Sequence, residues 1–459
     1  GALVRPWKAA AFKLYKDLKN LQKPQLEEES IYCGELGILL GVWATGNGLN
    51  MLMKKDIKRM LTQVERCESS IQSFRYTFLH GRGGLECMRA WLYKQKGKED
   101  DMLECGSELL EMAKEVVDME HSQCDLREGR AGYLYCIALM RVILSDPKFG
   151  DVEAVMVMQD LLQKGRTNKP SRVLEEDHDR DMLEWRPKSE KEIMARMNQE
   201  FTPDTDRTTS KSRYPLYFEN DDEPLLGAYT GITGILMALL LFPKELRELP
   251  SALDDIAGTM AEIIKNTYKT FNVRAAHGDN RDRWVQWCNG APGAIPPLLA
   301  LAKMESVPKE LRVTFLKSAK AFGEVTWVRG MLKTKGLGLC HSICGNGLLM
   351  LSLYQATRET VWLNRARHFG RVTLKRMEEL SKNTEDHLER SLFEGRAGAM
   401  MFFLALASPN TAWFPGYTCP KPVQASSNPK RPPAAMSNSG LATAISSGNN
   451  NAKRDRRSF

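Results

Sequence analysis

Gly231-Ile-Thr-Gly234 is one copy of the Gly-x-x-Gly pattern that decides the fold of this 459-residue chain. An apolar run from Ile235 to Phe242 follows it. Two glycines three residues apart recur before apolar runs, at Gly34-Glu-Leu-Gly37, Gly81-Arg-Gly-Gly84, Gly129-Arg-Ala-Gly132, Gly290-Ala-Pro-Gly293 and Gly395-Arg-Ala-Gly398. A seventh copy, Ser342-Ile-Cys-Gly345, keeps only the second glycine. The starts lie 47, 48, 102, 59, 52 and 53 residues apart, which indicates a repeat protein.

Amphipathic segments lie between these glycine turns. Apolar residues recur at helical spacing in Lys309–Val328, at Leu311, Phe315, Ala319, Phe322 and Val325. Residues 53–66, 99–118, 246–269 and 361–380 show a similar pattern. We therefore expect each repeat to consist of an amphipathic outer helix and an apolar inner helix that begins at the glycine turn. Seven such pairs predict an all-α fold, an (α/α)7 toroid; we favour this closed ring over an open solenoid because the inner helices are too apolar to leave a face in water.

The repeats predict three regions along the chain. An N-terminal segment, 1–30, precedes the toroid at 31–417, and a tail follows at 418–459. The 102-residue interval between the turns at Gly129 and Gly231 contains one repeat and a charged insertion at about 166–223. The charge of this insertion predicts a solvent-exposed segment, and a lid or docking surface is the alternative. The tail is rich in Ser, Asn, Pro and Ala and predicts disorder. Most of the net charge of +8 lies there, so the toroid gives no reason to expect nucleic-acid binding.

Composition indicates a cytoplasmic protein. Ten cysteines in a chain of this length do not suggest a secreted disulfide scaffold, and the apolar run from Gly231 to Phe242 is too short to span a bilayer. The segment Lys8–Leu21 combines apolar residues with lysines. An ordinary outer helix is the favoured interpretation of this segment, and weak peripheral contact with the plasma membrane is the alternative.

The repeat also allows the seven turns of the chain to be aligned with one another. The residues directly before the turns should occupy equivalent places on one rim of the ring, and they are Cys33, His80, Glu128, Thr230, Asn289, His341 and Glu394. One position earlier the residues are Tyr32, Leu79, Arg127, Tyr229, Cys288, Cys340 and Phe393. Polar and ligand-type side chains are therefore expected to gather at this rim.

Cys288, Cys340 and His341 are the candidate metal ligands. The two cysteines are equivalent positions in adjacent repeats, and His341 follows Cys340 directly. Two thiolates and one imidazole supply three corners of a tetrahedral zinc site, with the fourth open to water or substrate. Buried, unliganded thiols are the simpler explanation of each cysteine alone. Cys344, one helical turn after Cys340, and Cys33, on the rim of a distant repeat, are rival ligands.

Several of these motifs resemble the lanthionine synthetase C-like (LanC-like) family. The matching stretches are Trp287-Cys-Asn-Gly-Ala-Pro-Gly293, Gly338-Leu-Cys-His-Ser342 and Ser391-Leu-Phe-Glu-Gly395, with Gly278-Asp-Asn-Arg-Asp282 and Gly330-Met-Leu-Lys333 resembling the eukaryotic members. The resemblance spans roughly residues 30–417. It implies an (α/α)7 toroid with one zinc ion on Cys288, Cys340 and His341.

The resemblance further implies an activity, a co-substrate and binding residues. Eukaryotic members bind glutathione and are thought to add its thiol to dehydroalanine or dehydrobutyrine residues in proteins or peptides. Zinc would keep that thiol as the nucleophilic thiolate, and an acid must protonate the enolate formed by its attack. Lys335 falls where the family places a lysine that contacts glutathione, and Arg390 is a second candidate for substrate binding.

The chain departs from the family pattern at the proposed acid. Thr230, in Tyr229-Thr230-Gly231, replaces the expected histidine, and Asn289 stands where a histidine usually follows Cys288. His80, on the second turn, remains a candidate catalytic residue. These departures favour an alternative, a catalytically impaired zinc- and glutathione-binding protein with a signalling or scaffold role.

Two other classes of helical toroid fit less well. Prenyltransferase β subunits hold zinc through Asp, Cys and His, whereas this rim offers two cysteines and one histidine. Toroidal glycosidases need paired carboxylates. The rim carries Glu128 and Glu394, which lie three or four repeats apart around the ring.

Overall fold

The computed structural model describes residues 4–19, 29–72, 75–118, 123–168 and 214–421. Residues 1–421 form one compact unit. Its described part is helical, without β-strands, and contains two isolated β-bridges, Asn220 with Glu223 and Leu225 with Ala276. Most of the expected insertion and nearly all of the expected tail lie outside the described residues. None of the described helices is long and apolar enough to cross a membrane.

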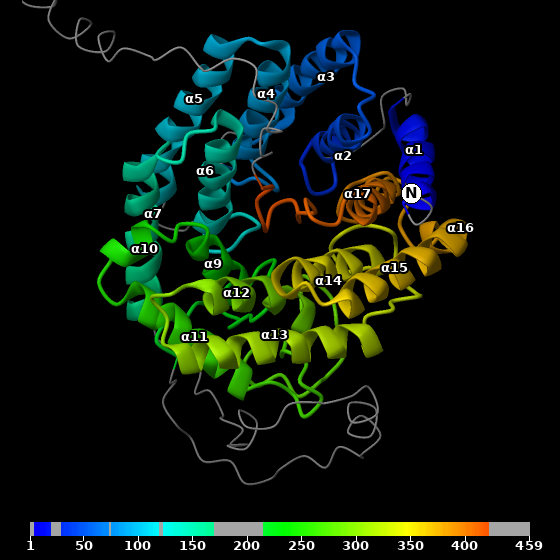
Figure 1. The fold of residues 1–459 in the computed structure, drawn as a ribbon. Helices are drawn as coiled ribbons and strands as arrows, with labels where there is room; N and C mark the ends of the chain where they lie inside the picture. The colour runs from blue at the N-terminus through cyan, green and yellow to red at the C-terminus, as the bar shows by residue number, and fades with distance from the viewer. Residues whose placement is uncertain (1–3, 20–28, 73–74, 119–122, 169–213, 422–459) are drawn as a thin grey trace, which may run out of the picture. The chain divides into compact units, whose positions relative to one another are not determined.

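The inner helices close into a ring. Each begins directly after one of the predicted turns: α2 (Glu35–Gly48), α4 (Arg82–Lys96), α6 (Arg130–Leu144), α9 (Ile232–Leu240), α12 (Ala291–Lys303), α14 (Ile343–Thr357) and α17 (Arg396–Ala407). Each packs against the next, and α17 packs against α2. Figure 1 shows them in this order around the unit. The predicted toroid is therefore confirmed, and the open solenoid is excluded.

Outer helices cover the ring. They are α3 (Lys54–Cys67), α5 (Glu99–Asp118), α7 (Asp151–Thr167), α11 (Ala252–Lys265), α13 (Lys309–Arg329) and α15 (Thr360–Lys375). Short elements add to them: the 3-10 turn η1 (Glu68–Ser70), α10 (Glu245–Glu248) and α16 (Met377–Ser381). The pairing follows the repeat, since α5 packs on α4, α13 on α12 and α15 on α14.

The N-terminal helix α1 (Arg5–Lys19) supplies the outer layer for the last inner helix. It packs against α17 and α2. Its buried side includes Trp7, Leu14 and Leu18, and the Trp7 ring stacks on Phe403 of α17 with centroids 6.3 Å apart. The apolar side of this lysine-bearing segment is therefore covered by the ring.

The second position of each turn requires glycine because another backbone segment approaches it closely. A Cβ atom there would lie 1.9–2.5 Å from the carbonyl oxygen six residues earlier in all seven turns. At the first position the glycines of five other turns are similarly restricted, because a Cβ atom would lie 2.1–2.5 Å from a backbone atom, and the seventh turn differs. Ser342 stands there with an extended backbone, and its Oγ accepts a hydrogen bond from Cys344 N at 3.0 Å, so that it caps α14. The seventh turn thus has a serine that caps the following helix in place of the first glycine.

Two predicted outer helices are interrupted. The segment predicted at 246–269 is split into α10 and α11, because Pro250 lacks a donor and Ser251 adopts a left-handed backbone with φ of 58°. The segment predicted at 361–380 divides at Arg376, between α15 and α16. The helix predicted at 309–328 is confirmed as α13.

The chain after α17 returns to the interior of the ring, where Figure 1 shows it in orange-red. Phe414 stacks on Trp287 with centroids 4.9 Å apart. The Tyr417 hydroxyl donates to the carbonyl of Gly293, and the Tyr135 hydroxyl donates to the carbonyl of Thr418 at 3.1 Å. This segment therefore packs against Trp287, the residue that precedes Cys288.

Candidate metal centre

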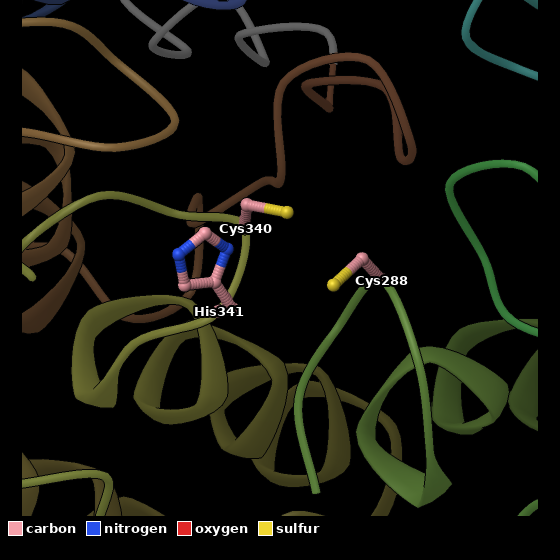
Figure 2. A group of neighbouring side chains, drawn as sticks. All are labelled: Cys288, Cys340 and His341. Carbon is pink, nitrogen blue, oxygen red and sulfur yellow. The ribbon is translucent and has the colours of Figure 1, made fainter. Parts of the chain in front are cut away.

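Cys288, Cys340 and His341 come together at the rim. Cys288 lies in the turn before α12, and the other two lie in the turn before α14. One ligand atom of each residue lies within 4.8 Å of the other two. Figure 2 shows the two sulfur atoms and one nitrogen of the imidazole facing a common point. The structure thus gathers the three residues that the repeat alignment singled out.

Backbone hydrogen bonds hold the equivalent rim positions side by side. The amide of Cys288 donates to the carbonyl of Cys340 at 3.4 Å, and the amide of Cys340 donates to that of Phe393 at 2.9 Å. The series continues from Phe393 to Tyr32 at 3.1 Å and from Tyr32 to Leu79 at 3.0 Å. These bonds link adjacent turns directly, so the repeat itself sets the spacing of the two cysteines.

The donor set suits a zinc ion. A tetrahedral zinc with bonds of about 2.0–2.3 Å keeps its ligand atoms about 3.7 Å apart, which the observed upper limit of 4.8 Å can accommodate. Cys288 and Cys340 are buried, whereas the His341 side chain is 31% exposed. Two thiols and an imidazole favour zinc over magnesium or calcium, which prefer oxygen ligands. A three-residue set leaves one corner for an incoming ligand.

A carboxylate orients the histidine. His341 Nε2 lies 3.0 Å from Glu394 Oε2, and the Tyr32 hydroxyl donates to the other oxygen of Glu394 at 2.8 Å. With Nε2 directed at Glu394, the nitrogen that faces the sulfur atoms in Figure 2 is Nδ1. A carboxylate behind a ligating histidine fixes its tautomer and raises its basicity.

The charges of the three groups depend on one another. The pKa of the Cys288 thiol is lowered to about 6, chiefly by a hydrogen bond from Cys340 and then by one from His341. Burial and the neighbouring Cys288 raise the pKa of the Cys340 thiol well above its usual value. Hydrogen bonds to Cys288 and Glu394 raise the pKa of His341 to about 9. A cation that binds here must therefore displace protons from Cys340 and His341.

Two amide side chains also contact the Cys288 sulfur. Gln286 Nε2 donates to Sγ at 3.2 Å, and Asn289 Nδ2 donates to it at 3.8 Å. Amide donors of this kind stabilise a thiolate. Asn289, which departs from the family pattern, thus contacts the sulfur of a candidate metal ligand.

An aromatic cluster adjoins the site. The Tyr32 ring stacks on Phe393, Tyr229 and His80, with centroid distances of 4.8, 4.9 and 5.1 Å. His80 Nε2 lies 2.7 Å from the Tyr229 hydroxyl. His80 therefore reaches the surroundings of the metal centre, although its repeat lies elsewhere in the ring. Thr230, by contrast, lines a small cavity together with Asp125 and Asn220.

The two residues predicted to bind substrate lie in loops that lead to the rim. Lys335 is exposed between α13 and α14, and its carbonyl accepts a hydrogen bond from Asn383 at 3.4 Å. Arg390 is half-buried before α17, and its carbonyl accepts from the amide of Ala397 at 3.3 Å. Among the contacts of the described residues, neither side chain touches a candidate ligand, so their role stays a prediction.

The two rival cysteines lie apart from the cluster. Cys344 is buried in α14, where its Sγ lies 3.9 Å from Thr373 Oγ1. Cys33 Sγ lies 3.6 Å from Ser30 Oγ. Neither belongs to a group of potential ligands within the described part of the chain.

Sequence reasoning did not assign roles to Glu394, Tyr32 or Tyr229. All three stood in the repeat alignment, because each occupies one of the two positions before a turn. That placement predicts the rim, and the structure adds the contacts: Glu394 to His341, Tyr32 to Glu394 and Tyr229 to His80.

Comparison with known proteins gives two similar relatives, one similar solved structure and one matching family model. The chain is 27% identical over 360 residues to glutathione S-transferase LANCL1 of Danio rerio, covering 78% of each protein. It is 28% identical over 405 residues to LanC-like protein GCL1 of Arabidopsis thaliana, covering 85% of this chain and 81% of the relative. The solved structure of nisin cyclase has the same fold, with a TM-score of 0.59 and 14% identity over 90% of this chain and 95% of that one. The family model for lanthionine synthetase C-like proteins matches residues 25–419, and the chain belongs to that family.

Proposed function

We propose that this protein is a zinc-dependent glutathione transferase that adds the glutathione thiol to dehydroalanine or dehydrobutyrine residues of proteins or peptides. The observation that carries this proposal is the meeting of Cys288, Cys340 and His341 at the rim. Family membership supports it, as does the similarity to a relative named as a glutathione S-transferase.

The side chains around the site have distinct roles in this proposal. Zinc on Cys288, Cys340 and His341 would hold the glutathione sulfur as a thiolate at the open corner. Glu394 keeps His341 in the ligating orientation. The partial exposure of His341 leaves the site open to solvent on one side, through which a peptide can approach. Lys335 and Arg390 are the proposed cationic partners for the glutathione carboxylates.

The alternative is a protein that binds zinc and glutathione without turnover. Thr230 favours this alternative, because the aliphatic hydroxyl of threonine is a poor proton donor in place of the expected histidine. The two functions predict the same metal and the same ligand, so only an assay for the product separates them.

Intact-mass analysis tests the activity. A dehydroalanine peptide incubated with the protein and glutathione should gain the mass of one glutathione faster than in a control without protein. A rate equal to that of the control would exclude the transferase, and glutathione binding by calorimetry would then support the binding protein.

Metal analysis tests the site itself. We expect about one zinc per wild-type chain and a loss of zinc in Cys288→Ala. Cys344→Ala is the matched control, because it removes a buried thiol one helical turn after Cys340. Full zinc content in Cys288→Ala would refute the assignment.

A further inference from the structure

Tyr229 and His80 form a hydrogen-bonded pair at the rim. The Tyr229 hydroxyl lies 2.7 Å from His80 Nε2, although the residues are 149 positions apart in the chain. They come from the fourth and second turns, so the ring brings them together. Both side chains are partly exposed to solvent. A phenol joined to an imidazole can pass a proton in either direction, since each group both donates and accepts.

The pair adjoins the metal centre through aromatic contacts. Tyr229 stacks on Tyr32 with an interplanar angle of 19° and tilts against Trp287 at a centroid distance of 5.8 Å. Trp287 directly precedes Cys288, and Tyr229 occupies the position equivalent to Cys288 in the preceding repeat. The phenol therefore lies on the same rim as the sulfur ligands, next to the repeat that supplies one of them.

Of the two rim tyrosines, Tyr229 is the one suited to proton transfer. The Tyr32 hydroxyl donates to Glu394, which in turn contacts His341. Loss of the Tyr32 proton would therefore disturb a candidate metal ligand. The Tyr229 hydroxyl contacts His80 instead, and burial raises its pKa well above the usual value, so the phenol stays protonated at neutral pH.

We propose that Tyr229 is the catalytic acid that protonates the α-carbon of the dehydroamino acid, and that His80 is the positioning residue that restores its proton. This inference rests on the transferase activity proposed above. His80 takes up the proton released from the glutathione thiol. The sulfur forms a bond to the β-carbon, the π electrons of the alkene move to form an enolate, Tyr229 gives its proton to the α-carbon, and His80 returns a proton to Tyr229. The thiol proton thus ends on the α-carbon, with no oxidant or reductant.

A catalytic acid in a fixed position determines the configuration of the product, whereas a tyrosine with only a structural role does not. Such an acid delivers the proton to one face of the enolate, so the new α-carbon of a dehydroalanine peptide should have a single configuration. Protonation by solvent would give a mixture. The configuration can be read by chiral amino-acid analysis after hydrolysis of the purified adduct.

The variants are Tyr229→Phe, which keeps the stacked ring, and His80→Gln. In Tyr229→Phe we expect kcat to fall about 100-fold, KM for glutathione and zinc content to stay unchanged, and the product to become a mixture of configurations. In His80→Gln we expect a smaller fall in kcat with the configuration retained. The double variant should be no slower than Tyr229→Phe, because both residues act in one step. Tyr354→Phe, in α14, is the matched control with wild-type kinetics.

The failures of the two proposals are distinguishable. An inactive wild type contradicts the transferase itself and, with it, the acid. An active wild type whose product already has mixed configuration overturns the role of Tyr229 alone, even if Tyr229→Phe does not fold. Wild-type kcat and a single configuration in Tyr229→Phe overturn it as well.

Discussion

Glu394 lies outside the candidate ligand set but contacts one of its members, His341. Its two oxygens contact different neighbours: one lies 3.0 Å from His341 Nε2, and the other accepts the Tyr32 hydroxyl at 2.8 Å. The side chain is 15% exposed, so water competes weakly for it. A histidine held in this way presents a single nitrogen to the metal and loses little rotamer freedom on binding.

Glu394→Gln should weaken zinc binding about 10- to 100-fold, because a neutral amide orients His341 less strongly and lowers its basicity. Competition with a chromogenic chelator measures the affinity. Glu128→Gln is the matched control, since Glu128 precedes the third turn in the same way but contacts Arg75 and Arg127. Equal affinities in the two variants would contradict the role of Glu394.

Zinc affinity should rise with pH between about pH 6 and 9. Zinc binds the deprotonated forms, whereas the raised pKa values of His341, about 9, and of Cys340 keep these groups protonated at neutral pH. Each displaced proton steepens the dependence by about tenfold per pH unit. The same chelator competition at several pH values tests this, and a flat profile would contradict proton displacement.

For the individual site residues, the repeat alignment predicted which side chains lie on the same rim. Cys288, Cys340 and His341 could be singled out because the two cysteines stood at equivalent positions of adjacent repeats and the histidine follows Cys340 directly. The roles of Glu394 and Tyr229 depend on the direction of each side chain across the ring. A one-dimensional alignment carries no such information, so these contacts could not be predicted.

Among the elements, the glycine turn is the most constrained. In the turn before α14, a Cβ on Gly345 would lie 1.9 Å from the carbonyl oxygen of Leu339. Leu339 directly precedes Cys340, so a shift of this backbone would also move a candidate ligand. The inner helix and the candidate metal centre therefore depend on the same close contact.

Gly345→Ala should lower the free energy of unfolding by about 3 kcal/mol, because the methyl group overpacks against backbone that cannot move aside cheaply. Urea unfolding measures the loss. Gly97→Ala is the control: Gly97 ends α4 at φ 70° with open space around it, so the cost is about 1 kcal/mol from backbone strain alone. Similar losses in both variants would contradict the close approach.

Periodicity predicted where helices lie better than where they break. The 20-residue helix α5 was predicted with the bounds that the structure shows, Glu99–Asp118, because its apolar positions are uninterrupted. The break between α10 and α11 follows from Pro250 and the left-handed Ser251. Apolar residues keep their helical spacing across that break, so the spacing alone predicted one continuous helix at 246–269.

For the whole molecule, closure of the ring joins distant parts of the sequence. Inner helix α17 contacts both α2 and the N-terminal α1. Trp7 of α1 is 4% exposed and stacks on Phe403. The first helix thus covers the last repeat, which makes α1 part of the closed structure.

Trp7→Ala should destabilise the protein by about 3–5 kcal/mol, since it removes a large buried side chain. Hydrogen exchange should show the largest loss of protection in α17. Leu103→Ala, on α5, is the control, because Leu103 is 49% exposed and its loss should cost little. Equal changes in α17 and α9 would indicate general rather than local destabilisation.

The closed ring followed from the apolar character of the inner helices, and the outer helix favoured for Lys8–Leu21 is confirmed as α1, but the helix on which it packs was not predicted. Residues 1–30 contain no glycine turn, so the repeat gave no reason to place them against α17. The return of Phe414 and Tyr417 to the interior was equally hidden, because two aromatic residues in a loop show no periodicity.

The contact between α1 and α17 also sets an order of events during biosynthesis. Helix α1 is translated well before its partner α17, which begins only at Arg396. Until then the nascent chain carries the Trp7 face of α1 uncovered. The ring cannot be completed on the ribosome before its last repeat has emerged. A messenger truncated ahead of that repeat would yield a product with two unpaired apolar ends, which we expect chaperones and proteases to recognise.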